Sequence, residues 1–251
     1  MTEKTSYAAG TPSWIDIGVP DAAAAGAFYG GLFGWTLDID PRPEAGGYGM
    51  FKLRGLNVAG LGPQMNTEMP PFWSVYVTVA SLEDSLALSV ANGGTTVMPA
   101  MDVLDVGRMA IIQDPMRTFI SLWQPLAHHG CDVVNETGAF TWNELSTPDV
   151  AASTAFYAAV FGWGIGAEGS SDQGTLFTLD GEMLCGSHQA GEGEFPSWSV
   201  WFSVEDCDAS AALVASLGGR VIVPPNDMGF GRGAVVADPA GAVFGIGAMG
   251  G

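Results

Sequence analysis

Two carboxylates occupy equivalent places in an internal repeat of this sequence. Asp16 lies in the segment Trp14-Ile15-Asp16-Ile17, and Glu144 lies in Trp142-Asn143-Glu144-Leu145, 128 positions later. Side chains alternate along a strand, so each carboxylate shares one face with a tryptophan. Desolvation among indole rings raises the pKa of a carboxylate, which can then remove a proton beside a carbonyl group. Glu144 and Asp16 are therefore the candidate catalytic residues.

Aromatic and hydroxyl side chains are expected to surround these carboxylates. The same alternation in the next predicted strands, Trp73 to Val79 and Trp198 to Ser203, turns one set of side chains inward. A pocket of indole, phenol and a few hydroxyl groups suits a flat, partly apolar small molecule. The candidate ligand-binding residues are Trp14, Ser74 and Tyr76 in the first half and Trp142, Ser199 and Trp201 in the second.

Two arginines occupy matched positions, although the chain has only 8 basic residues. Arg108 and Arg232 are both predicted to face inward. They could form buried ion pairs with Asp16 and Glu144 respectively, which would lower the pKa of each carboxyl. Alternatively, they could grip a carboxylate or enolate of the ligand. Both interpretations stay open at this stage.

The elements that position these residues come from a duplication. The motifs Phe28-Tyr29 and Leu32-Phe33-Gly34-Trp35 return as Phe156-Tyr157 and Val160-Phe161-Gly162-Trp163. A constant register of this kind indicates two copies of one structural unit. In each copy a strand is followed by a Pro-Asp turn whose Asp can cap a helix, and a glycine ends that helix. We expect the repeated aromatic residues to form the core between helix and sheet.

Each half contains the same order of elements twice. A second strand and helix begin at Trp73 and Ser81, and further strands follow, with Asp114-Pro115 and Asp238-Pro239 as the final hairpin turns of the two halves. The sequence thus predicts four βαβββ modules in two domains, residues 11–125 and 138–249, joined by a linker over residues 126–137.

Composition restricts the possible partners. The chain has 251 residues, of which 27 are acidic, and a net charge of −19. Such a surface repels phosphate backbones and anionic lipids, so we expect no nucleic acid and no membrane partner. No apolar run reaches membrane-spanning length, the N-terminus lacks the pattern of a signal peptide, and the three cysteines are scattered. We expect a cytoplasmic protein with buried, unreactive thiols.

The doubled module with these motifs resembles the vicinal oxygen chelate superfamily, which includes glyoxalase I, bleomycin-resistance proteins and extradiol dioxygenases. The opening Gly-Thr-Pro-Ser-Trp at residues 10–14 is similar to tandem glyoxalase-like proteins of actinobacteria. The resemblance covers residues 11–249. It implies an α+β fold with two half-open β-barrels, each built from two modules, and an active site on the inner face of the curved sheet.

Metal-dependent members of this superfamily bind their ion through the first strand of each module and a last strand. The corresponding positions here hold Trp14 and Trp142, then Ser74 and Ser199, and finally Ser121 and Gly245. Indole and glycine are not metal ligands, and a hydroxyl alone is a poor one for first-row metals. We therefore expect no metal and no cofactor. An all-oxygen site that uses Asp16 or Glu144 is the alternative.

Three functions compete on this evidence. The first is metal-independent binding of a small aromatic or carbonyl-bearing molecule, in the manner of the resistance proteins. The second is an enzyme, either a lyase, isomerase or cyclase that uses Glu144 or Asp16 as general base, or a detoxifier of methylglyoxal type. The third is a structural protein whose cavities are filled by tryptophan. Because one chain can close both barrels, a monomer is expected before a weak homodimer.

Overall fold

The computed structural model describes residues 3–167, 169–229 and 231–249. Each half of the chain forms the same series of elements. The first half contains β1 (Pro12–Val19), α1 (Ala22–Phe33), β2 (Thr36–Ile39), the 3-10 helix η1 (Pro43–Ala45), β3 (Gly49–Leu53), β4 (Leu56–Pro63), β5 (Trp73–Thr78), α2 (Leu82–Ala91), β6 (Thr95–Val103), β7 (Gly107–Gln113) and β8 (Phe119–Pro125). The second half contains β9 (Phe140–Thr147), α3 (Val150–Phe161), β10 (Gly164–Ile165), β11 (Gly174–Leu179), β12 (Glu182–Gln189), β13 (Ser197–Ser203), α4 (Cys207–Ser216), β14 (Arg220–Asp227), β15 (Gly231–Ala237) and β16 (Val243–Met249).

Each half builds one eight-stranded mixed sheet. The strand order is β2-β3-β4-β1-β5-β8-β7-β6 in the first sheet, and β10-β11-β12-β9-β13-β16-β15-β14 in the second repeats it. The antiparallel pair β1/β5 joins the two modules of the first sheet, and β9/β13 does so in the second. The predicted α+β fold with four modules in two half-open barrels is therefore confirmed.

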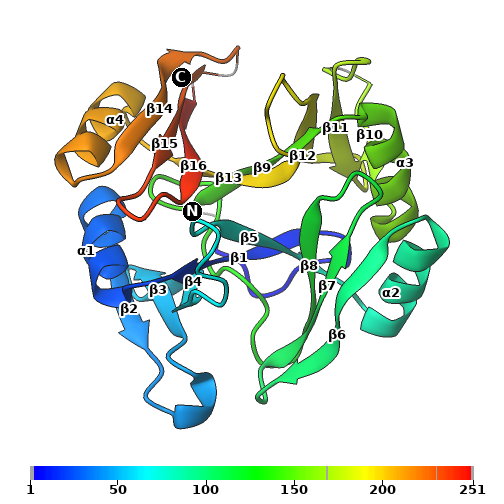
Figure 1. Ribbon diagram of the computed structural model, residues 1–251, viewed down its shortest axis with the longest axis horizontal. Helices are drawn as coiled ribbons and strands as arrows, with labels where there is room; N and C mark the ends of the chain where they lie inside the picture. Colours follow the sequence, from blue (N-terminus) through cyan, green and yellow to red (C-terminus); the bar gives the residue numbers. More distant parts are fainter. Residues whose placement is uncertain (1–2, 168, 230, 250–251) are drawn as a thin grey trace.

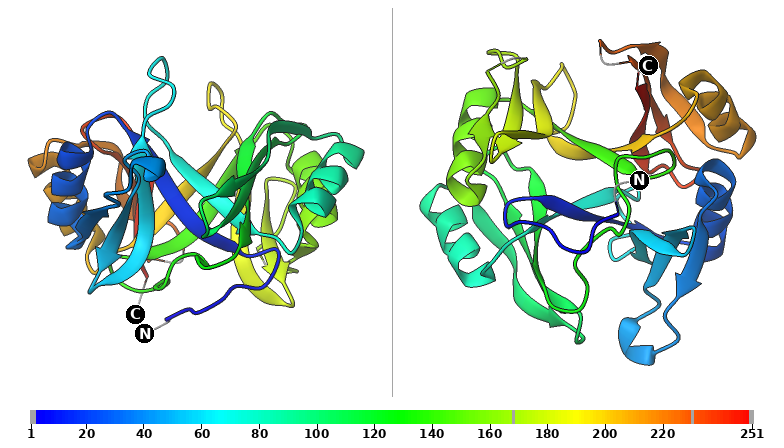
Figure 2. Two further views of the ribbon diagram at one scale, coloured as in Figure 1. Left: turned by 90° about the horizontal axis from the view of Figure 1, so that it is seen from below. Right: turned by 180° about the vertical axis from the view of Figure 1, so that it is seen from behind.

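The four helices flank the sheets in two pairs. Figure 1 shows α1 beside α4 on one flank and α2 beside α3 on the other, and the two views of Figure 2 show the same pairing. Each pair thus joins a helix of the first half to a helix of the second.

The predicted helix ends are present. The Asp21 side chain accepts a hydrogen bond from Ala24 N (3.0 Å), and Asp149 accepts the equivalent bond from Ala152 N (2.9 Å). Gly34 and Gly162 end α1 and α3 at φ values of 72° and 73°, a left-handed conformation that favours glycine. The duplication therefore preserves the local chemistry that starts and stops each first helix.

The repeated aromatic residues do more than join helix to sheet within one half. The Tyr29 hydroxyl donates to Asp238 Oδ2 of the second half (3.1 Å), and the Tyr157 hydroxyl donates to Asp114 Oδ2 of the first half (2.9 Å). The indole of Trp35 donates to the Gly138 carbonyl at 2.7 Å, across the same interface. The motif that revealed the duplication therefore holds the two copies together.

Two further observations concern the sequence expectations. Within the part of the chain that the structure describes, no helix is long and apolar enough to cross a membrane. Cys131, Cys185 and Cys207 are free thiols and all three are buried, as expected.

Removing the Tyr157 hydroxyl should destabilise the fold strongly. This oxygen accepts from Trp198 Nε1 (3.0 Å) and donates to Asp114 Oδ2, and all three groups are buried. The variant Tyr157→Phe leaves two buried polar groups without their partner, so we expect a loss of about 2–4 kcal/mol in the free energy of unfolding. Urea denaturation measures this loss.

The control is Tyr7→Phe, which removes a single hydrogen bond from a half-buried hydroxyl to the Cys131 carbonyl. This change should cost about 1 kcal/mol. An equal cost for the two variants would show that the bond between the halves is not special.

Candidate functional site

A cavity of about 640 Å³ lies against the inner face of the first sheet. Its walls come from β1, β2, β3, β5, β6, β7 and β8, from the segment around η1, from the turn between β6 and β7, and from the chain after β8. Its aromatic and central titratable side chains are Trp14, Asp16, Tyr48, Tyr76, Trp123 and His128. The candidate residues Trp14, Asp16 and Tyr76 therefore lie together in one cavity.

Asp16 is the focus of the hydrogen bonds in this cavity. Its Oδ2 accepts from the hydroxyls of Tyr48 (3.1 Å) and Tyr76 (2.9 Å), and Trp14 Nε1 donates to the Tyr48 hydroxyl (3.1 Å). The side chain touches the cavity on one side and is enclosed by protein on the others. Burial raises the pKa of Asp16, although hydrogen bonds from Tyr76, Tyr48 and Ser74 partly oppose this shift.

A glycine in β4 makes this contact possible. Gly60 pairs with Asp16 in the parallel ladder between β1 and β4. A Cβ atom at Gly60 would overlap the Tyr48 hydroxyl, so only glycine leaves room for Tyr48 to reach the carboxylate. Sequence reasoning missed Tyr48, because it lies in the segment before β3 and has no counterpart in the other half.

The strand register shows which side chains lie opposite one another on β1 and β5. Tyr76, rather than Ser74, lies opposite Trp14, and Ser74 lies opposite Asp16. Tyr76 is in turn paired with Ser121 of β8. Trp14, Tyr76 and Ser121 therefore form one row across β1, β5 and β8. Trp14 and Ser121 are two of the positions that the resemblance assigned to metal ligands.

The second half carries an even less suitable row. Trp142 lies opposite Trp201, and Trp201 pairs with Gly245, whose missing side chain leaves the space that the indole ring occupies. Neither row is a ligand set for a first-row metal, because each lacks imidazole, thiolate and carboxylate. Among the residues that the structure describes, no three His, Cys, Asp or Glu side chains are grouped so that they could hold a metal ion.

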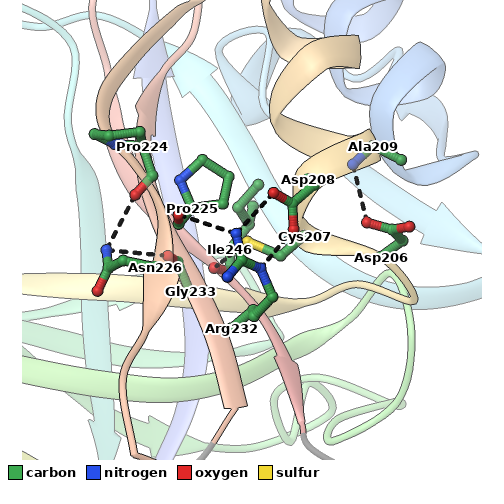
Figure 3. Close-up of polar contacts among 10 residues, drawn as sticks. All are labelled: Asp206, Cys207, Asp208, Ala209, Pro224, Pro225, Asn226, Arg232, Gly233 and Ile246. Carbon is green, nitrogen blue, oxygen red and sulfur yellow. Dashed lines mark hydrogen bonds and ion pairs between the residues drawn. The ribbon is translucent and has the colours of Figure 1, made fainter.

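The prediction that Arg108 and Arg232 face inward and pair with the site carboxylates was wrong. Arg108 forms ion pairs with Glu83 of α2 (2.7 Å) and Asp102 of β6 (3.2 Å). Arg232 binds Asp208 of α4, with its Nη2 2.7 Å from Asp208 Oδ1 (Figure 3).

The sequence expectation put Arg108 on the wrong face of its strand, which is an error of one residue in the alternation of side chains. Met109 lines the cavity, so its neighbour Arg108 projects from the opposite face of β7, toward the helix. A shift of one residue moves every side chain of a strand to the other face. Neither arginine is therefore available to the cavity carboxylates.

In the second half, Glu144 has different partners from those of Asp16. Glu144 Oε2 accepts from Trp142 Nε1 (2.7 Å), and its Oε1 lies 3.4 Å from His188 Nδ1. The other ring nitrogen of His188 lies 3.0 Å from Glu194 Oε1. The hydrogen bond to Glu144 raises the pKa of His188, against the opposing effect of burial. Ser199 bonds only the main-chain oxygen of Glu144 (3.1 Å).

Trp123 and His128 are further site residues that were not among the sequence candidates. For His128 the contacts are specific. Its ring packs edge-on against Trp14, with ring centres 4.3 Å apart, and its buried Nε2 has no hydrogen-bond partner. Burial lowers the pKa of His128 to about 4. No local motif marks this residue, because the path of the chain after β8 brings it to the cavity.

The pKa values of His128 and His188 should therefore lie on opposite sides of the ordinary histidine pKa. In an NMR titration, the His128 ring should stay neutral down to about pH 4, whereas the His188 ring should take up its proton above the usual histidine pKa. Because folding favours neutral His128, this residue's contribution to stability should be lost as the pH falls from its unfolded pKa of about 6.5 toward the folded value.

The variant Glu144→Gln distinguishes the two histidines by their pKa values. It should lower the pKa of His188 and leave that of His128 unchanged, since Glu144 contacts only the former. Identical titration curves for both rings would contradict the described environments.

The comparisons with known proteins agree with this architecture. A family model described as a glyoxalase-like domain matches residues 142–246. The chain is 39% identical over 254 residues to the "Putative glyoxylase CFP32" of Mycobacterium tuberculosis, covering 98% of this chain and 97% of that protein. It is 34% identical over 261 residues to the "Anthracycline biosynthesis protein DnrV" of Streptomyces peucetius, covering 96% of this chain and 94% of that protein.

Solved structures show the same fold at low sequence identity. The Mn(II)-bound glyoxalase from Novosphingobium aromaticivorans superposes with a TM-score of 0.67 at 14% identity, over 96% of this chain and 82% of that one. The 2,3-dioxygenase LapB from Pseudomonas sp. KL28 gives a TM-score of 0.66 at 18% identity, over 96% and 92%. With full-length relatives above 30% identity and this shared fold, the chain belongs to the glyoxalase-like family of the vicinal oxygen chelate superfamily.

Proposed function

We propose that this protein binds a small aromatic or carbonyl-bearing molecule in the cavity of its first glyoxalase-like unit, residues 11–125, without a metal ion at the superfamily's position. The second unit is assigned to residues 138–249, with residues 126–137 as the connection. One observation carries the proposal: the first unit has a cavity of about 640 Å³ around the hydrogen-bonded Asp16. An indole, a phenol and one hydroxyl form the row that we compare with the superfamily's metal ligands.

The cavity combines the two features of a small-molecule site. Apolar side chains such as Met50, Val103 and Met109 form walls that can cover a flat ring system. Asp16 and its two tyrosines offer a few directed polar groups that can orient the ligand. The relatives named for anthracycline biosynthesis support an aromatic ligand, since an anthracycline is an aromatic compound.

Ligand binding should be visible in tryptophan fluorescence. With protein treated with EDTA, 1,4-naphthoquinone, an aromatic carbonyl compound, should give a saturable change because Trp14 and Trp123 line the cavity. Trp14→Phe should weaken binding about 5- to 10-fold through lost contact area. The matched change Trp142→Phe in the second half should leave the affinity unchanged.

Two results would contradict the proposal. The absence of any saturable change across aromatic carbonyl compounds would mean that the cavity does not serve as a binding site. A large gain in affinity after Mn²⁺, Ni²⁺ or Zn²⁺ is added to the treated protein would mean that binding depends on a metal.

A second candidate function is proton transfer, and the environment of Asp16 favours it. Because burial raises the pKa of Asp16, its carboxylate is a stronger base than an exposed one. Such a base could take a proton from the carbon beside a ligand carbonyl, and the electron pair left behind would move onto the carbonyl oxygen as an enolate. This step is common to isomerases, lyases and cyclases, and to an enzyme that acts on methylglyoxal-type compounds. Glu144 is the corresponding base of the second half.

Isotope exchange tests this second function. In D₂O, the protein should accelerate the exchange of the proton beside the carbonyl of 2-tetralone, and Asp16→Asn should reduce the rate by about 10²- to 10⁴-fold. The affinity for this neutral ketone should change little. Glu144→Gln is the parallel variant, and exchange that depends on Glu144 instead would move the reaction to the second half. Unchanged exchange in both variants would exclude these carboxylates as the base.

A further inference from the structure

Asp16 is a half-buried carboxylate that lines the cavity. Within the described residues, Asp16 forms no ion pair. The basic side chains near the cavity are already engaged: Arg42 with Asp40 (2.7 Å), Lys52 with Asp38 (2.6 Å) and Arg108 with Glu83 (2.7 Å). Phenol hydroxyls are its closest polar partners, and His128 stays neutral because burial lowers its pKa to about 4. A partly buried charge without a cationic partner carries a desolvation cost, so a carboxylate at the wall of a cavity favours a cationic group on the ligand.

The second half shows what the missing partner would be. Glu144 occupies the place of Asp16, and Gly186 pairs with Glu144 as Gly60 pairs with Asp16. Two residues beyond Gly186 stands His188, whose Nδ1 lies 3.4 Å from the Glu144 carboxylate. Two residues beyond Gly60 stands Gly62, which has no side chain. The second half therefore has an imidazole nitrogen of its own beside the carboxylate. In the first half the Tyr48 ring packs over Gly60 and Gly62, and Asp16 lines the cavity with hydroxyl groups as its printed side-chain partners.

The rest of the cavity favours a positive ligand group. The rings of Trp14, Tyr48, Tyr76 and Trp123 line the same cavity as Asp16, and aromatic faces attract ammonium groups. Four more carboxylates line the cavity, whereas Arg42 is the only lysine or arginine among its lining residues and is bound to Asp40. These carboxylates are Asp38, Asp40, Glu44 and Asp102. Asp40, Asp38 and Asp102 have the cationic partners Arg42, Lys52 and Arg108, whereas Asp16 and Glu44 form no ion pair within the described residues. The net charge around the cavity is therefore negative and opposes an anionic ligand.

We propose that the ligand of the first unit is an arylalkylamine, a molecule with a flat aromatic ring system and a protonated aliphatic amino group that pairs with Asp16. The apolar walls cover the ring system, and the ammonium approaches Asp16 from the cavity. It would be the nitrogen partner of Asp16, as the His188 imidazole is that of Glu144 in the second unit. This inference rests on the function proposed above and narrows its ligand class. It also disfavours substrates that carry a carboxylate or phosphate.

Three probes with one ring system and different charges test the inference. Isothermal titration at neutral pH compares 2-naphthylmethylamine, 2-naphthylmethanol and 2-naphthoate with the full-length protein. We expect the amine to bind at least about 10-fold more tightly than the alcohol, and the carboxylate to bind weakest, because a charge-assisted contact in a partly desolvated site distinguishes them. This comparison needs no variant and so does not depend on how a substitution affects folding.

The variant Asp16→Asn keeps the size of the side chain and removes its charge. It should reduce the affinity for the amine to that for the alcohol and leave the alcohol unchanged. The control Asp84→Asn makes the same change of total charge on the exposed face of α2, away from the cavity, and should leave all three affinities as they were.

The outcomes separate the two proposals. Equal binding of amine and alcohol, tightest binding of the carboxylate, or an equal effect of Asp84→Asn would overturn the cationic ligand while the binding function stands. Binding of none of these probes, together with no response to the aromatic carbonyl compounds, would overturn both.

Discussion

The structure depends on a buried hydrogen bond that is made twice between the halves of the chain. Tyr29 of the first half reaches Asp238 of the second, and Tyr157 of the second reaches Asp114 of the first. Each Asp also accepts main-chain hydrogen bonds that form its own hairpin turn, so one carboxylate closes a turn and receives the tyrosine of the other half. The cost of leaving any of these groups unpaired ties the position of each helix to the last hairpin of the opposite sheet. These two bonds therefore fix the two halves of the fold relative to each other.

With the frame fixed in this way, the two inner faces have diverged. Both carry a carboxylate at the same place in the first strand, but Tyr48 and Tyr76 surround Asp16 whereas Trp142 and His188 surround Glu144. The second face places the His188 imidazole beside its carboxylate and holds the Trp201 ring over Gly245. The first face keeps an unpaired carboxylate beside open volume, which makes it the better candidate for recognition of a ligand.

The residues at the positions compared with metal ligands distinguish this chain from metal-dependent relatives. Relatives by fold include a manganese-bound glyoxalase and dioxygenases, whereas this chain places Trp14, Tyr76 and Ser121 in the corresponding row. The phenol and indole groups offer contact area and hydrogen-bond donors at the cavity wall. The binding and proton-transfer proposals use these groups and the Asp16 carboxylate.

The sequence by itself determined the repeat, the modules and the helix caps, because these depend on local spacing: a cap Asp three residues before its N–H partner, and a glycine where the helix must end. It also placed Trp14 and Asp16 on one face, since alternation within a short strand is reliable. Only the tertiary structure decided which face Arg108 takes, because strand parity across a loop depends on register. It alone brought Tyr48 to Asp16 and His128 to Trp14, because these contacts join segments 32 or more residues apart through a packing that no local pattern encodes.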